Sequence, residues 1–153
     1  MTEIRTTPGG TVKWSRDATA NDSDKIVLTV PTGKLVRLID VAGTIVNTAT
    51  VGNRTLRVDI GNGTNVIWYS QISANITASQ RGSIRIRFSG AAMTVYTSAQ
   101  YGLDGNYENI NISQTGPEMW LPAGYTVRIW DTAAIDAAAD DLTTVIEYIE
   151  YDA

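Results

Sequence analysis

Four aspartates form the densest group of side chains that could do chemistry in this sequence. Asp131, Asp136, Asp140 and Asp141 lie within the segment WDTAAIDAAADDL. Two carboxylates at the right separation can hydrolyse a glycosidic bond, and calcium needs six to eight oxygen ligands. The spacing differs from that of an EF-hand loop. We favour a structural role, in which Asp131 caps an alanine-rich helical turn and Asp140 and Asp141 end it in solvent.

The residue types that are missing exclude most other catalytic chemistry. The 153-residue chain contains no cysteine and no histidine. Thiolate nucleophiles, disulfides, imidazole bases and His-ligated metals are therefore excluded. The Gly61-Asn62-Gly63 segment belongs to neither a phosphate-binding loop nor a dinucleotide-binding motif. We predict that the chain is not an enzyme and has no catalytic, cofactor-binding or metal-binding residues.

Arginines form a second group with chemical potential. In alternating segments such as SIRIRF they point away from the apolar face of separate strands, namely Arg57, Arg85, Arg87 and Arg128. If those strands share a sheet, the guanidinium groups form a basic stripe that could pair with carboxylates across an interface. An equally open alternative is a solvated sheet face with internal partners such as Asp59. The net charge of −4 argues against a nucleic-acid partner.

Aromatic side chains form the third group. Trp68, Trp120 and Trp130 lie in or beside predicted strands, which favours positions in the core and at its margins. A sugar-stacking platform is the alternative, and it requires these three tryptophans to be exposed on one flat patch. Trp14 lies in a polar segment, and we expect it to dock on the rest of the chain or on a neighbouring molecule.

The elements that must position these groups are strands. Threonine, isoleucine and valine make up 48 of the 153 residues, and such β-branched side chains favour strands. Regularly spaced short strands predict an all-β fold, an antiparallel β-sandwich of about eight strands. A jelly roll suits this number, and an immunoglobulin-like sandwich is the rival. The expected strands are 25–30, 35–47 with a bend at Gly43, 54–60, 64–72, 83–88, 92–97, 125–130 and 142–151.

Alternation within these strands also predicts which residues form the core. The expected inward-facing residues are Leu56, Val58, Ile60, Ile84, Ile86, Phe88, Val127 and Ile129. The polar segment 98–118 is expected to hold little structure, and 132–141 to form a short helix.

The segment 1–24 is expected to be an extended N-terminal arm, followed by a β-sandwich domain at 25–153. Ile4, Val12 and Trp14 are costly to leave in water, so we expect them to pack on a neighbouring subunit. Together with Arg57, Arg85 and Arg87 they are the predicted interface residues. A first edge strand of the same domain is the open alternative for 11–16.

Two targeting signals are missing from the sequence. No apolar run approaches 18 residues, so no membrane span is expected. The start, MTEIRTTPGG, lacks the basic and then apolar pattern of a signal peptide.

Three blocks of sequence, taken in order, resemble a known class of proteins. They are VPTGK, then VGNRTLRVDIGNG leading to NVIWYS, and finally LPAGYTVRIWDTAAIDAAADDL. The order is similar to that of small β-rich virion proteins of tailed bacteriophages, most of all capsid decoration or cement proteins. The resemblance covers residues 30–142, leaving out the segment 1–24 and the connection 98–118.

The resemblance implies a structural protein with a jelly-roll-like domain and no catalytic residues. It implies a homo-oligomer, a trimer, which is made in the host cytoplasm and binds the major capsid protein on the capsid surface. The alternative is a carbohydrate- or receptor-binding β-sandwich module of a phage tail or of a secreted enzyme.

Overall fold

Strands dominate the structure, a computed structural model that describes residues 5–7, 9–71, 76–89, 95–101, 108–133, 135–136 and 139–153. Twelve strands lie within these ranges and no helix does. The strands are β1 (Arg5–Thr7), β2 (Gly10–Asp17), β3 (Asp24–Thr29), β4 (Lys34–Val46), β5 (Leu56–Gly61), β6 (Val66–Gln71), β7 (Arg81–Phe88), β8 (Val95–Tyr101), β9 (Glu108–Gly116), β10 (Trp120–Leu121), β11 (Thr126–Asp131) and β12 (Asp141–Asp152).

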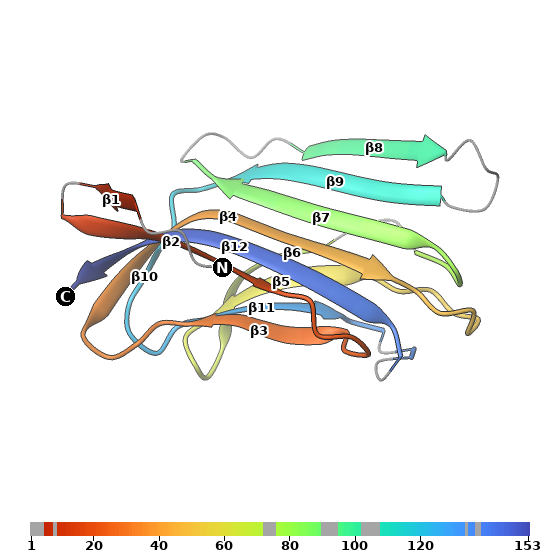
Figure 1. Cartoon of the computed structure of the whole chain (residues 1–153), viewed down its shortest axis with the longest axis horizontal. Coiled ribbons are helices and arrows are strands. Elements are labelled where there is room, and N and C mark those ends of the chain that lie inside the picture. The colour runs from red at the N-terminus through yellow and green to blue at the C-terminus, as the bar shows by residue number, and fades with distance from the viewer. Residues whose placement is uncertain are drawn as a thin grey trace.

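The strands form two sheets (Figure 1). The large sheet has the order β1-β2-β12-β4-β7-β9-β8, and β10 pairs with β4 as well. The small sheet has the order β3-β11-β5-β6. Neighbouring strands are antiparallel except β7 and β9, which run parallel. The predicted all-β class is confirmed, and no described helix could cross a membrane.

The two sheets face each other across one apolar core. All eight residues predicted to face inward are buried, which confirms the alternation argument. Trp68 of the small sheet meets Phe88 of the large sheet edge to face, with ring centroids 5.5 Å apart. A Cβ atom at Gly43 would lie only 2.9 Å from a side-chain carbon of Ile129. Gly43 therefore permits close approach of the sheets.

Within β4, the predicted bend at Gly43 is wrong. The strand continues through Gly43, and its irregularity lies at Ile39, which has no partner where the register shifts between Glu147 and Tyr148. A bulge supplies the extra bending that a 13-residue strand needs, and the glycine is used for packing instead.

The described part of the segment 1–24 is not a separate arm. Residues 10–17 form β2, which pairs with β12 from Asp17↔Thr144 to Thr11↔Glu150. The alternative interpretation, a strand of the same domain, therefore describes this segment. Pairing with β12 satisfies the backbone N–H and C=O groups of a stretch whose own sequence could not form a core.

Two further predictions about segments need correction. The polar segment 98–118 contains the end of β8, all of β9 and a parallel ladder with β7. In 132–141, the described residues form turns, in which the carbonyl of Asp136 accepts the N–H groups of Ala139 and Asp140.

Candidate functional site

A groove on the outer face of the large sheet is the main candidate site. Four adjacent strands, β2, β12, β4 and β7, supply its lining. Residues two apart in a strand point to the same face, so each strand contributes alternate residues. We call this site the large-sheet groove, defined by Val12, Trp14, Asp40, Ala42, Arg85, Val145 and Glu147.

Cross-strand pairing explains why this face is hollow. One row across the sheet is Arg16, Val145, Ala42 and Arg85, and its two middle side chains are short. The next row contains Trp14 and Glu147, whose side chains are longer than those of Val145 and Ala42 and border the hollow. The resulting hollow has a volume of about 430 Å³.

A second hollow of about 500 Å³ continues the groove along the same face. It shares Asp40, Arg85 and Glu147 with the first hollow. Its other lining residues are Arg37, Ile39, Arg87, Phe88 and Ser89. The combined space is of the size that small-molecule sites in proteins occupy.

An ion pair fixes the centre of the groove. The Arg85 Nε donates to Asp40 Oδ2 at 2.8 Å, and the Arg85 guanidinium makes a second hydrogen bond to the same oxygen. These hydrogen bonds, assisted by the Asp40 charge, raise the pKa of Arg85 above its ordinary value. Asp40 is only 8 % exposed, and its second oxygen, Oδ1, receives no hydrogen bond from any described residue.

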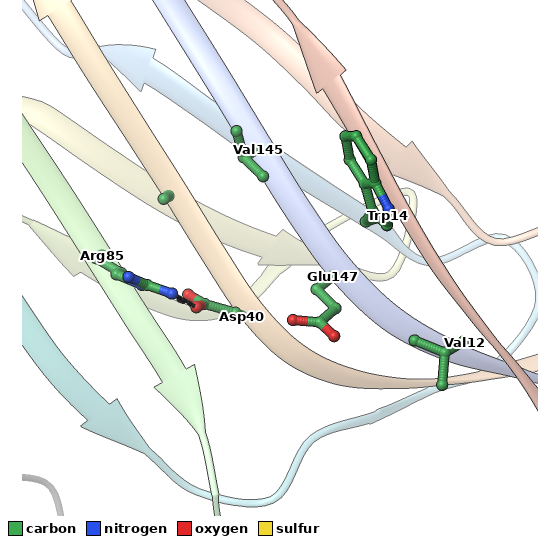
Figure 2. A pocket seen from close by; sticks show the side chains of 7 residues that line it. Val12, Trp14, Asp40, Arg85, Val145 and Glu147 are labelled. Carbon is green, nitrogen blue, oxygen red and sulfur yellow. Dashed lines mark hydrogen bonds and ion pairs between the residues drawn. The ribbon is translucent and has the colours of Figure 1, made fainter. Parts of the chain in front are cut away.

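Glu147 is the second carboxylate of the groove. It lies between Trp14 of β2 and Asp40 of β4 in the pairing register. Within the described part of the chain its carboxylate forms no hydrogen bond and no ion pair, although its charge acts on Arg85. Figure 2 shows its carboxylate between the Arg85–Asp40 pair and Trp14. The groove therefore presents acceptor oxygens beside an indole ring.

The outer face of the small sheet is a second candidate surface. Register places Ile26, Arg128, Asp59 and Tyr69 in one row across its four strands. The Arg57 guanidinium bonds to Asp59 and lies 4.0 Å from the centre of the Tyr69 ring.

The same surface contains a second stacked arginine. Arg128 lies 4.1 Å from the centre of the Trp130 ring, and its Nε donates to Asp24 at 2.6 Å. The Trp130 indole N–H donates to Asp59 at 2.8 Å. We call this surface, made of Asp24, Ile26, Arg57, Asp59, Tyr69, Arg128 and Trp130, the small-sheet face.

The acidic segment proves to be part of a buried network. Arg54 and Asp140 are completely buried, and Arg54 Nε donates to Asp140 Oδ2 at 2.9 Å. Asp136 Oδ2 accepts the hydroxyl groups of Thr48 and Thr50, each at 2.7 Å, which lowers the pKa of Asp136. The prediction that Asp140 faces solvent is wrong, because the charge of Arg54 compensates its burial.

The other two aspartates of this segment also accept backbone hydrogen bonds. Asp131 Oδ1 accepts the N–H groups of Thr55 and Ala133, and Asp141 Oδ1 accepts that of Asn21. The described residues contain no group of three or more acidic side chains placed to hold a metal ion.

The predicted interface residues are distributed over both sheets. Val12, Trp14 and Arg85 meet in the large-sheet groove, and Arg87 lines the adjoining hollow. Arg57 lies on the opposite sheet, so one continuous arginine stripe is not formed. Ile4 lies outside the described residues.

The arginines that sequence analysis singled out form ion pairs with aspartates of the same chain. Arg57, Arg85 and Arg128 each bond to an aspartate, and Arg87 lies 3.9 Å from Asp40. The sequence analysis missed Asp40 and Glu147 as site residues. An acidic residue inside an otherwise apolar strand, as in LIDV and VIEY, is the signal that could have found them.

The sugar-stacking platform, the alternative for Trp68, Trp120 and Trp130, is not formed. Trp68 packs against the core beside Phe88, and Trp130 lies on the small-sheet face. The ring of Trp120 is tilted against that of Tyr151, with the ring centroids 5.4 Å apart. These three tryptophans therefore cannot make one flat platform.

Comparisons with known proteins supply little further information. No family model and no curated protein sequence matches the chain. One solved structure that a structural comparison matches is the agarase AgWH50C, at a TM-score of 0.31 and 9 % identity, where the match covers 99 % of this chain and 22 % of that one. Another is the capsular polysaccharide assembling protein CapF from Staphylococcus aureus, at a TM-score of 0.26 and 10 % identity. That match covers 96 % of this chain and 28 % of that one. The chain thus spans less than a third of either protein.

Proposed function

We propose that this chain is a jelly-roll β-sandwich that serves as a structural subunit of a tailed-phage virion, without catalytic activity. The jelly roll is supported by the order of eight of the strands. These strands are β2 to β7, β11 and β12, and we number them 1 to 8 in sequence order. In this numbering the large sheet has the order 1-8-3-6 and the small sheet has the order 2-7-4-5. This order fits the double Greek key of a jelly roll, a fold found in viral capsid and lectin domains.

In this proposal the subunit decorates the head shell and stabilises it. It binds the major capsid protein and copies of itself, as a trimer, on the capsid surface after synthesis in the host cytoplasm. The virion assignment rests on the sequence resemblance over residues 30–142, without the connection 98–118. The structure contributes a surface suited to binding another protein.

The observation that carries the proposal is the exposed apolar area on the small sheet. Ile26 is 64 % exposed and Tyr69 is 58 % exposed on the small-sheet face, and edge strand β6 also exposes Val66 and Ile67. Ile26 and Tyr69 lie on the two edge strands of the sheet, with the paired side chains of Arg128 and Asp59 between them in the register. Such a mixed surface suits a protein interface, because interfaces are enriched in Tyr, Trp and Arg.

Stacking and ion pairing further prepare this surface for a partner. Arg57 and Arg128 are already held by Asp59 and Asp24 and lie over aromatic rings. Side chains fixed in advance lose little conformational entropy on binding, which favours affinity. We therefore assign the small-sheet face to the contact with the shell or with a second copy.

The test is association with particles from the producing host. Mass spectrometry of purified virions should find this chain at a fixed ratio to the major shell protein. Ile26→Lys should reduce rebinding of purified protein to stripped particles, because it places a charge in the contact.

The matched control is Val51→Lys. Val51 is 90 % exposed in the connection between β4 and β5, and this change should leave rebinding unaltered. Absence of the chain from virions would disprove the virion role, and equal rebinding of both variants would disprove the assignment of the face.

A receptor- or carbohydrate-binding module is the second candidate function. The large-sheet groove is the observation that favours it, because the groove combines the indole ring of Trp14 with the carboxylate of Glu147, which has no described side-chain partner.

A further inference from the structure

We infer that the large-sheet groove binds a neutral glycan. This inference rests on the second candidate function above and names its ligand class, and it is separate from the shell contact assigned to the small-sheet face. Three features of the groove point to a sugar: a stacking surface, open hydrogen-bonding groups and a balance of charge.

Trp14 supplies the stacking surface. It is half-buried on β2, and the hollow that it lines also contains Val12, Ala42 and Val145. A pyranose ring has an apolar face of C–H groups, and an indole ring offers a large, rigid apolar surface to pack against it. The short side chains of Ala42 and Val145 leave room for a ring beside the indole.

Glu147 supplies the hydrogen-bond acceptors for sugar hydroxyl groups. Asp40 contributes to the shape and charge of the groove, because its Oδ2 is held by Arg85 and its Oδ1 is buried from solvent. The Glu147 carboxylate has no described hydrogen-bond partner and lies next to Trp14 in the pairing register.

Register gives the groove its length. Trp14, Glu147, Asp40 and Arg87 form one row across β2, β12, β4 and β7. Three spacings between neighbouring strands amount to about 14 Å. A row of this length, with an indole at one end and a guanidinium at the other, can contact several sugar units in succession.

The charges of the groove favour a neutral ligand. Asp40 and Glu147 oppose Arg85 and Arg87 within the two hollows, and the third arginine of the lining, Arg37, is paired with Glu118 at 3.0 Å. Arg85 is neutralised by Asp40, so an anionic sugar at the centre would meet the charge of Glu147. A cationic peptide would meet Arg87, whose side chain is 63 % exposed. Hydroxyl groups can donate to the Glu147 carboxylate and accept from Arg87 without either penalty.

Isothermal titration calorimetry of the full chain with defined probes tests the inference. The probes are cellohexaose, maltohexaose, mannohexaose and galactohexaose, with hexagalacturonate and hexalysine as charged probes. We expect at least one neutral probe to bind. Trp14→Ala and Glu147→Gln should each weaken that binding about tenfold, as loss of a central contact does.

Controls separate a lost site from a lost fold. Val51→Lys changes a residue that is 90 % exposed in the connection between β4 and β5, outside both the groove and the small-sheet face, and it should leave sugar binding unchanged. Far-UV circular dichroism shows whether each variant is folded, and Glu147→Gln preserves the side-chain shape if Trp14→Ala fails to fold.

The inference is overturned if no neutral probe binds, if both groove variants bind as the wild type does, or if only a charged probe binds. The shell-binding proposal stands apart from these outcomes. Ile26→Lys should affect particle binding without affecting sugar binding, and the groove variants should do the reverse.

Discussion

Removing one partner of the buried Arg54–Asp140 pair should be among the most damaging single changes in this protein. Both side chains are completely buried and lie 86 residues apart in sequence. Asp140 Oδ1 also accepts the N–H of Thr48 at 2.8 Å, and Arg54 donates to the carbonyl of Thr50 at 2.7 Å. The pair thus joins the connection after β4 to the segment before β12.

The magnitude follows from leaving a charge buried without its counter-ion. Breaking a buried ion pair on one side costs about 3–5 kcal/mol of unfolding free energy. Asp140→Ala should show a loss of this size, since the guanidinium would remain enclosed. The free energy of unfolding decreases by about 1–3 kcal/mol per molar urea. The loss should therefore lower the urea concentration at the unfolding midpoint by roughly 2 M.

Urea unfolding of four proteins is the assay: the wild type, Asp140→Ala, Arg54→Met and the double variant. The double variant should lose less than the sum of the single losses, because it contains no unpaired buried charge. Single losses below about 1 kcal/mol, or strictly additive losses, would refute the idea that the buried charges depend on each other.

Three other predictions concern the core, acid and metal ions. Ile86→Ala should cost about 2–5 kcal/mol in urea unfolding because Ile86 is fully buried, whereas Ile26→Ala at an exposed position should change little. Lys25, mainly through its hydrogen bond, lowers the pKa of Asp17 from 3.8 to about 2, so its stabilisation is complete above about pH 4 and lost between pH 4 and pH 2. Thermal melts should show this loss, and Asp17→Asn should reduce it. Addition of EDTA should leave the melting temperature unchanged, and a large drop would contradict the structural role of the acidic segment.

Strands with strong alternation could be predicted from the sequence because their side chains reveal the face that is buried. In RTLRVDI the apolar residues Leu56, Val58 and Ile60 are buried, and even the partner of Arg57, Asp59, could be named in advance. Local pattern was sufficient there because both residues lie two apart on one strand.

Features that depend on distant segments could not be predicted in this way. β9 was missed because its polar sequence gives no strand signal, and its ladder depends on β7. Arg54 and Asp140 meet only because the fold brings two connections together. The large-sheet groove is built from four strands, and no segment alone indicates that Trp14, Glu147 and Asp40 will share a row.

The position of β12 between β2 and β4 has a consequence for how the chain folds. Residues 141–152 must pair with both neighbours, one of which lies near the start of the sequence. The large sheet therefore cannot be completed during synthesis until this segment has left the ribosome. Until then β2 and β4 have no strand between them, and unpaired strands of this kind favour chaperone binding or aggregation. Because the sheet becomes ordered only when β12 pairs with β2, which lies far away in the sequence, folding should be slow and cooperative.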